Sequence, residues 1–98
     1  MNMQALMQQA QKMQRDITKK KDELNSKEFV GSSELVEVVM TGDKKVVSVK
    51  IKSDGLSDDD KEVLEDMITI AMNDAMNKVD KETEKVLGAY GNQLNGLF

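Results

Sequence analysis

The feature that most constrains this chain is a helical pattern that runs without interruption from residue 57 to residue 87. An α-helix of that length is roughly 45 Å long, whereas a compact globule of 98 residues is only about 30 Å across. The helix is therefore too long to be buried within one copy of the chain. Its outer part is expected to project or to pack against a second copy, and a two-fold homodimer is the commonest closed arrangement.

The apolar residues of this segment recur at helical spacing and predict its buried face. They are Val63, Leu64, Met67, Ile68, Ala71, Ala75 and Val79. At its start, Ser57 and Asp60 have the spacing of a capping box, and the neighbouring carboxylates suit the positive end of a helix dipole. At its end, Gly88 and Gly91 stop the pattern, so residues 88–98 are expected to form a loosely ordered tail.

A second amphipathic helix is predicted for residues 1–25, which Asn25 and Ser26 can close. Its apolar residues recur every three or four positions, in a pattern typical of a coiled-coil seam. They are Met3, Leu6, Ala10, Met13, Ile17 and Leu24. The pattern breaks once, where Lys20 takes an apolar place. The methionines are interpreted as packing residues, because flexible thioether side chains fill irregular spaces well.

Between the helices, residues 28–52 predict three antiparallel strands. The strand signals lie at residues 28–30, 35–40 and 45–52, with tight-turn composition at residues 41–44. In the last run, Val47, Val49 and Ile51 alternate with polar residues, so one face is expected to meet a core and the other water or a ligand. The prediction is one α+β domain over residues 1–98, with the order α-β-β-β-α.

Composition excludes much catalytic chemistry. The chain has no Cys, His, Pro or Trp, which removes disulfides, thiolate or imidazole metal ligands, and the commonest nucleophile and base pairs. The carboxylates of residues 58–66 lack the ligand spacing and central Gly of a calcium loop, and helix capping accounts for the first three. We expect neither an enzyme nor a bound cofactor or metal. No apolar run is long enough to span a bilayer, so we expect a cytoplasmic protein.

Charge is distributed unevenly along the chain, which carries a net charge of -4. Lys12, Arg15 and Lys19 recur at three- and four-residue intervals and therefore share one helix face. A second set of cations lies near the end of the last helix, diluted by carboxylates. It consists of Lys78, Lys81 and Lys85, interspersed with Asp80, Glu82 and Glu84. Both sets are candidate phosphate contacts, and the alternative is an ordinary solvated helix face.

Two segments resemble one protein family. Residues 60–68, continuing through residues 71–75, are similar to the most characteristic segment of the YbaB/EbfC family of bacterial nucleoid-associated proteins, and residues 6–14 resemble the opening helix of that family. The resemblance covers essentially the whole chain. It departs where the third strand ends Ile51-Lys52-Ser53, in place of an Ile-Asp-Pro type sequence, and where the tail lacks a Pro-rich ending.

The resemblance implies an intertwined homodimer with projecting helices that binds double-stranded DNA in the bacterial nucleoid, with an architectural or gene-regulatory role and no catalysis. We expect no membrane partner and no small-molecule substrate. Carried over to this chain, it makes Lys12, Arg15, Lys19, Lys78, Lys81 and Lys85 the expected DNA contacts. Phosphate contacts position a protein without reading bases, so limited sequence specificity is expected.

Residues 3–13 of the first helix and 63–75 of the last, taken as their inner halves, are expected to form the dimer core. Its predicted residues are Met3, Leu6, Ala10, Met13, Leu64, Ile68 and Ala71. The alternative function is a protein-interaction module that docks partner helices on Met- and Leu-rich surfaces.

Overall fold

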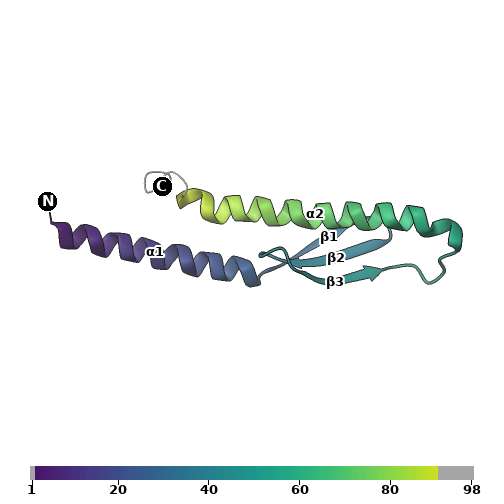
Figure 1. Cartoon of the computed structure of the whole chain (residues 1–98), viewed down its shortest axis with the longest axis horizontal. Coiled ribbons are helices and arrows are strands. Elements are labelled where there is room, and N and C mark those ends of the chain that lie inside the picture. The colour runs from purple at the N-terminus through teal and green to yellow at the C-terminus, as the bar shows by residue number, and fades with distance from the viewer. Residues whose placement is uncertain (1, 91–98) are drawn as a thin grey trace.

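The computed structural model describes residues 2–90 and confirms the predicted α-β-β-β-α order (Figure 1). The elements are α1 (Met3–Ser26), β1 (Glu28–Ser32), β2 (Val36–Thr41), β3 (Val46–Ile51) and α2 (Lys61–Leu87), with short 3-10 helices η1 (Asp58–Asp60) and η2 (Gly88–Tyr90). Residues 88–90 of the predicted tail thus form a helical turn. Residues 91–98 lie outside the described part of the chain.

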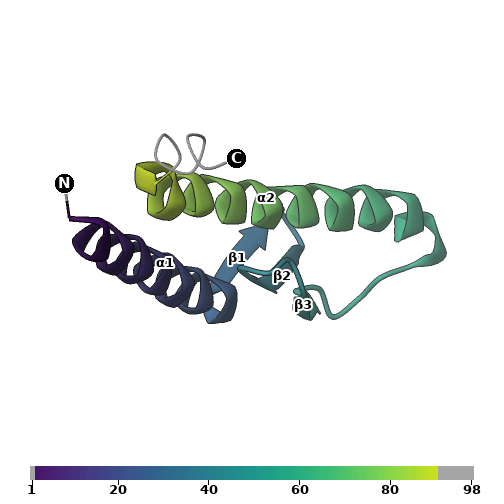
Figure 2. The same ribbon diagram turned by 60° about the vertical axis from the view of Figure 1, so that its left-hand side comes forward.

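The chain is elongated. It measures 71 × 19 × 15 Å and has a radius of gyration of 19.7 Å, whereas a compact chain of this length would have one of about 13 Å. Both views show α1 leading away from the sheet, on the same side as the C-terminal half of α2 (Figures 1 and 2). The surplus helix length inferred from the sequence therefore projects beyond the sheet.

Side-chain caps determine where both helices begin. The Asn2 side chain accepts hydrogen bonds from the backbone N–H groups of Gln4, at 3.0 Å, and Ala5, at 3.4 Å, which satisfies two of the free donors of the first turn of α1. Before α2, the Ser57 N–H donates to Asp60 Oδ2 at 2.9 Å. The predicted capping box is therefore present, and it starts the helix with the 3-10 turn η1.

The sheet is antiparallel in the order β1-β2-β3. Phe29 pairs with Met40, and Val38 pairs with Gly31 on one side and Val49 on the other. The register between β2 and β3 shifts near Met40, and the turn before β3 contains one residue with a left-handed backbone, Lys44, at φ 65°. The predicted hairpin turn is confirmed.

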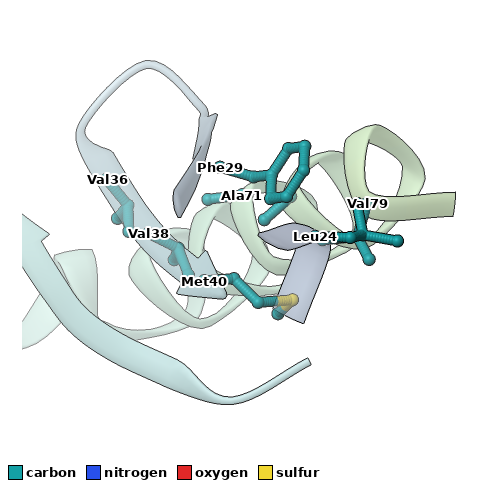
Figure 3. Packing of buried hydrophobic residues seen from close by; sticks show 8 residues of the cluster. Leu24, Phe29, Val36, Val38, Met40, Ala71 and Val79 are labelled. Carbon is teal, nitrogen blue, oxygen red and sulfur yellow. The ribbon is translucent and has the colours of Figure 1, made fainter. Parts of the chain in front are cut away.

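The hydrophobic core lies between α2 and the strands β1 and β2 (Figure 3). It consists of Leu24, Phe29, Val36, Val38, Met40, Ala71, Ala75 and Val79. Leu24 fixes the end of α1 to this core. On α2 the predicted buried face is confirmed for its alanines and Val79, but the prediction is wrong for Val63, which is 49% exposed because it lies outside the line of contact with the sheet.

Strand β3 has no buried residue. The expectation that one of its faces meets a core is therefore wrong within a single chain. Val49 and Ile51 pair with the buried residues Val38 and Val36 and so share their face of the sheet. They remain 46% and 41% exposed because α2 packs across β1 and β2, and β3 is the strand farthest from it in both views (Figures 1 and 2).

Candidate nucleic-acid interface

Helix α1 has one side that faces the body of the chain and one that faces away. Leu24 is 4% exposed and lies in line with the predicted apolar residues of this helix. Arg15 is nine residues before Leu24, which at 3.6 residues per turn places it about 180° around the helix. The side chain of Arg15 therefore belongs to the side of α1 that faces away from the core.

The three predicted cations of α1 are exposed. Within residues 2–90, Lys12, Arg15 and Lys19 form no ion pair with a carboxylate. Arg15 and Lys19 lie along an open stretch of surface that is formed by residues of α1 alone. Cations that are exposed and unpaired in this way can exchange their counterions for phosphate groups.

The cations of α2 lie in a different setting. Lys78 donates a hydrogen bond to the Val30 carbonyl oxygen at 2.6 Å, and its Nζ lies 3.4 Å from Asp74 Oδ2. This lysine therefore fastens α2 to β1. Lys81 and Lys85 are exposed. The two predicted sets do not form one surface within the chain, because the α1 set faces away from the body whereas Lys78 lies against the sheet.

Asp74 occupies the outer edge of β1 together with Lys78. Its Oδ2 accepts a hydrogen bond from the Ser32 N–H at 2.9 Å. This bond, and then the charge of Lys78, lowers the pKa of Asp74 below its ordinary value. Side chains of α2 thus satisfy backbone groups on this edge, which protects it from pairing with another strand. On the opposite edge, no strand within residues 2–90 pairs with the outer side of β3.

Carboxylates near the second cation set are paired across the fold. Glu82 forms an ion pair with Lys27 at 3.1 Å, and Asp80 forms one with Lys44 at 3.0 Å. Two of the acidic residues that dilute this lysine set in the sequence are therefore partly neutralised by lysines from elsewhere in the chain.

A crevice of about 350 Å³ between α1 and α2 gathers further cations that the sequence prediction missed. Lys20 of α1 and Lys27, the residue that follows α1, border it together with Lys85 of α2. The break in the apolar pattern at Lys20 was the sequence signal for this position. Lys27 carried no such signal, because its partner Glu82 lies 55 residues away.

The predicted dimer-interface residues differ in how exposed they are. On α1, Met3 and Leu6 are 71% and 44% exposed, Ala10 is also exposed and Met13 is half-buried. On α2, Leu64 and Ile68 are partly buried against the core. Ala71 is 0% exposed because it packs against β1 of its own chain, which leaves it no surface to offer a second copy.

No helix within residues 2–90 is both long and apolar enough to pass through a bilayer. In that part of the chain, no three carboxylates converge closely enough to hold a metal ion.

The chain as a whole is acidic, but the projecting helix carries a small group of cations that have no ion-pair partner within residues 2–90. A basic patch of this kind is the feature by which nucleic-acid-binding proteins are recognised. Residues 1–94 match the YbaB/EbfC DNA-binding family, and the chain belongs to that family. The resemblance inferred from residues 6–14, 60–68 and 71–75 is thereby confirmed.

Relatives match over nearly the full length. A nucleoid-associated protein of Streptococcus suis is 47% identical over 96% of this chain and 97% of its own length. Nucleoid-associated proteins of Ligilactobacillus salivarius and Enterococcus faecalis are each 41% identical, over 99% and 98% of this chain and 95% and 94% of their own lengths.

Proposed function

We propose that this chain forms a homodimer that binds duplex DNA, mainly through phosphate contacts, and serves an architectural or gene-regulatory role in the bacterial nucleoid. The observation that carries the proposal is the position of Arg15 and Lys19, exposed on the side of α1 that faces away from the core. Family membership and the names of the relatives support the same conclusion.

The proposed phosphate contacts are the six cations predicted from the sequence. Lys12, Arg15 and Lys19 support the role best, because they have no ion-pair partner within residues 2–90. Lys81 and Lys85 can extend the contact along α2. Lys78 would have to give up its hydrogen bond to the Val30 carbonyl oxygen to bind phosphate fully, so we assign it the smallest contribution.

Support for the homodimer comes from an apolar surface that one chain leaves uncovered. We call it the β3 surface, and it consists of Val46, Val49 and Ile51, all exposed on the α2 side of the sheet. Among the residues that the structure describes, no strand pairs with the adjoining edge of β3, whereas the edge of β1 is occupied by Asp74 and Lys78. Strand β3 therefore offers a second copy of the chain both an edge for strand pairing and an uncovered apolar face for packing.

Helix α2 extends this surface. Asp74 and Lys78 reach the edge of β1, and helical spacing places Met72 and Met76 on the other flank of α2, toward β3. Both methionines are only partly buried. We propose that a second copy covers the β3 surface and these methionines, together with Leu64, Ile68 and the apolar line of α1, formed by Met3, Leu6, Ala10 and Met13.

A gel-shift titration of duplex DNA at several salt concentrations tests the proposed function. Because binding through phosphates releases counterions, affinity should fall steeply as salt rises. Failure to bind at low salt, or an affinity that does not depend on salt, would contradict the proposal. An unrelated protein of similar net charge serves as the control for non-specific retention.

A second candidate function is favoured by one observation, the exposure of Met3 and Met7 at 71% and 60%. Adaptable methionine surfaces can dock partner helices, so the chain could serve as a protein-interaction module. A pull-down with and without nuclease separates the two functions. Partners retained after nuclease treatment favour the module, and partners lost with the DNA favour the leading proposal.

We also propose that the protein has no catalytic activity and acts in the cytoplasm. The family is a DNA-binding family and not an enzyme family. The chain contains neither Cys nor His, so it lacks the residues that most often act as nucleophile and base. Fluorescence of a tagged copy in dividing cells should coincide with stained DNA.

A further inference from the structure

We infer that α1 reads base edges in the major groove through one line of polar residues, Gln4, Gln8, Gln11 and Arg15. We call this line the glutamine stripe. The inference rests on the proposed DNA binding and adds to it the residues that determine sequence preference. It also predicts which bases they recognise.

The spacing of the four stripe residues places them on one side of α1. Their separations of four, three and four residues confine them to a sector of about 60° around the helix. All four side chains are exposed. Gln9 and Gln14 lie on α1 as well, but helical spacing places them outside this sector.

The apolar line of α1 shows that the stripe faces outward. Leu24 belongs to the apolar line and is buried against the core, whereas Arg15 is about 180° from it. When the apolar line is directed toward the body, or toward a second copy, the glutamine stripe is therefore left as the outer side of the helix.

The dimensions of α1 suit the major groove. The stripe residues are exposed, and they lie on the side of the helix opposite the apolar line that a second copy is proposed to cover. The stripe is therefore left free to approach DNA. An α-helix with its side chains is about 10–12 Å wide, and the major groove is about 12 Å wide. From Gln4 to Arg15 the stripe is about 17 Å long, which corresponds to about five base pairs at 3.4 Å each.

The hydrogen-bonding groups of the stripe side chains match particular bases. A glutamine amide has a donor and an acceptor that fit N7 and N6 of adenine, and the guanidinium of arginine fits O6 and N7 of guanine. Lys12 and Lys19 lie together on one flank of the stripe. They can hold phosphates on that side of the groove, so in this inference they, and not Arg15, make the phosphate contacts of α1. Asp22 follows Arg15 on the same line, and its negative charge marks the end of the surface that DNA can approach.

The test compares sequence preference with affinity. Wild-type protein, Gln8→Ala/Gln11→Ala and the matched control Gln9→Ala are each used to select sites from a random duplex library, and affinities are then measured for the selected and a scrambled duplex. We expect the wild type and Gln9→Ala to prefer adenine-containing sites roughly tenfold or more. We expect Gln8→Ala/Gln11→Ala to lose that preference.

Salt dependence separates base reading from phosphate contact. Amide side chains carry no charge, so Gln8→Ala/Gln11→Ala should retain the salt slope of the wild type on the scrambled duplex. Alanine favours helix at least as well as glutamine, so the variant should retain its helix content by circular dichroism.

Three results would overturn the inference. The wild type could bind DNA without base preference, which would leave the proposed function intact. The double variant could retain the full preference, or the Gln9→Ala control could lose it equally. If the wild type binds no DNA even at low salt, the proposed function fails together with the inference.

Discussion

Ala75 of α2 lies directly over Gly31 of β1, so closely that a Cβ added to Gly31 would lie 2.7 Å from the Ala75 Cβ. The same added atom would also collide with backbone atoms of Ala71 and Ala75. Backbone cannot move aside as a flexible side chain can. The missing side chain at Gly31 thus allows α2 to pack against the sheet.

Gly31→Ala should therefore separate α2 from β1 and destabilise the fold by about 1–3 kcal/mol or more, the usual cost of overpacking a core. Urea unfolding followed by circular dichroism measures the change. Gly55→Ala is the matched control, because no atom lies within 4 Å of an added Cβ there and no glycine in the described residues has a positive φ. Equal effects of the two substitutions would contradict this account of the packing.

Val49→Asp should weaken self-association at least tenfold, because burying an unpaired carboxylate in an apolar contact is costly. Val49 is 46% exposed in one chain, so the folded subunit should tolerate the change. Light scattering over a concentration series gives the oligomeric state. Ser48→Asp adds the same charge on the opposite face of β3 and serves as the control. A monomeric wild type, or a dimer unaffected by Val49→Asp, would exclude the β3 surface as the interface.

Lys19→Gln should reduce the salt dependence of DNA binding, because Lys19 is exposed and forms no ion pair within residues 2–90. Each phosphate contact contributes about 0.9 to the slope of log affinity against log salt, so a dimer that loses two contacts should lose roughly 2 from the slope. Lys21→Gln removes one charge from the other side of α1, where Lys21 borders a hollow with residues of α2 and the β2–β3 turn. If both variants change the slope equally, net charge alone explains binding, and the assignment of Lys19 as a phosphate contact is wrong.

Asp74→Ala should destabilise the fold at neutral pH, because Ser32 N–H and Lys78 would lose their acceptor. The pKa of Asp74 is lowered from 3.8, first by the Ser32 N–H and then by Lys78. A carboxylate with a lowered folded-state pKa contributes stability above its unfolded-state pKa and loses that contribution as pH falls through the folded-state value. The difference between wild type and Asp74→Ala should therefore shrink as pH falls below 3.8.

Urea midpoints measured over a pH series provide the comparison for Asp74. Asp80→Ala is a suitable control, since Asp80 makes an exposed ion pair with Lys44 and such pairs contribute little to stability. A difference between wild type and Asp74→Ala that stays constant as the solution is acidified would mean that packing, and not the charge, accounts for the effect.

The candidate site was only partly predictable. The cations of α1 could be assigned to one helix face from spacing alone, because three- and four-residue intervals describe the helix itself. Lys78 shares that kind of spacing with Lys81 and Lys85, yet it bonds to the Val30 carbonyl oxygen, 48 residues away. No local pattern distinguishes a lysine that is free to bind phosphate from one that holds two elements together.

The sequence alone determined the helices, the strands, the turn at residues 41–44 and the capping box at Ser57, because these depend on neighbours a few residues apart. It also determined that the last helix exceeds the size of a compact subunit. Only the tertiary structure decided how that length is used. Gly31 lets α2 pack over β1 and β2, and this packing buries Ala71 and leaves Val49 uncovered. Which side of a strand or helix is covered depends on contacts between distant segments, and periodicity does not specify the partner.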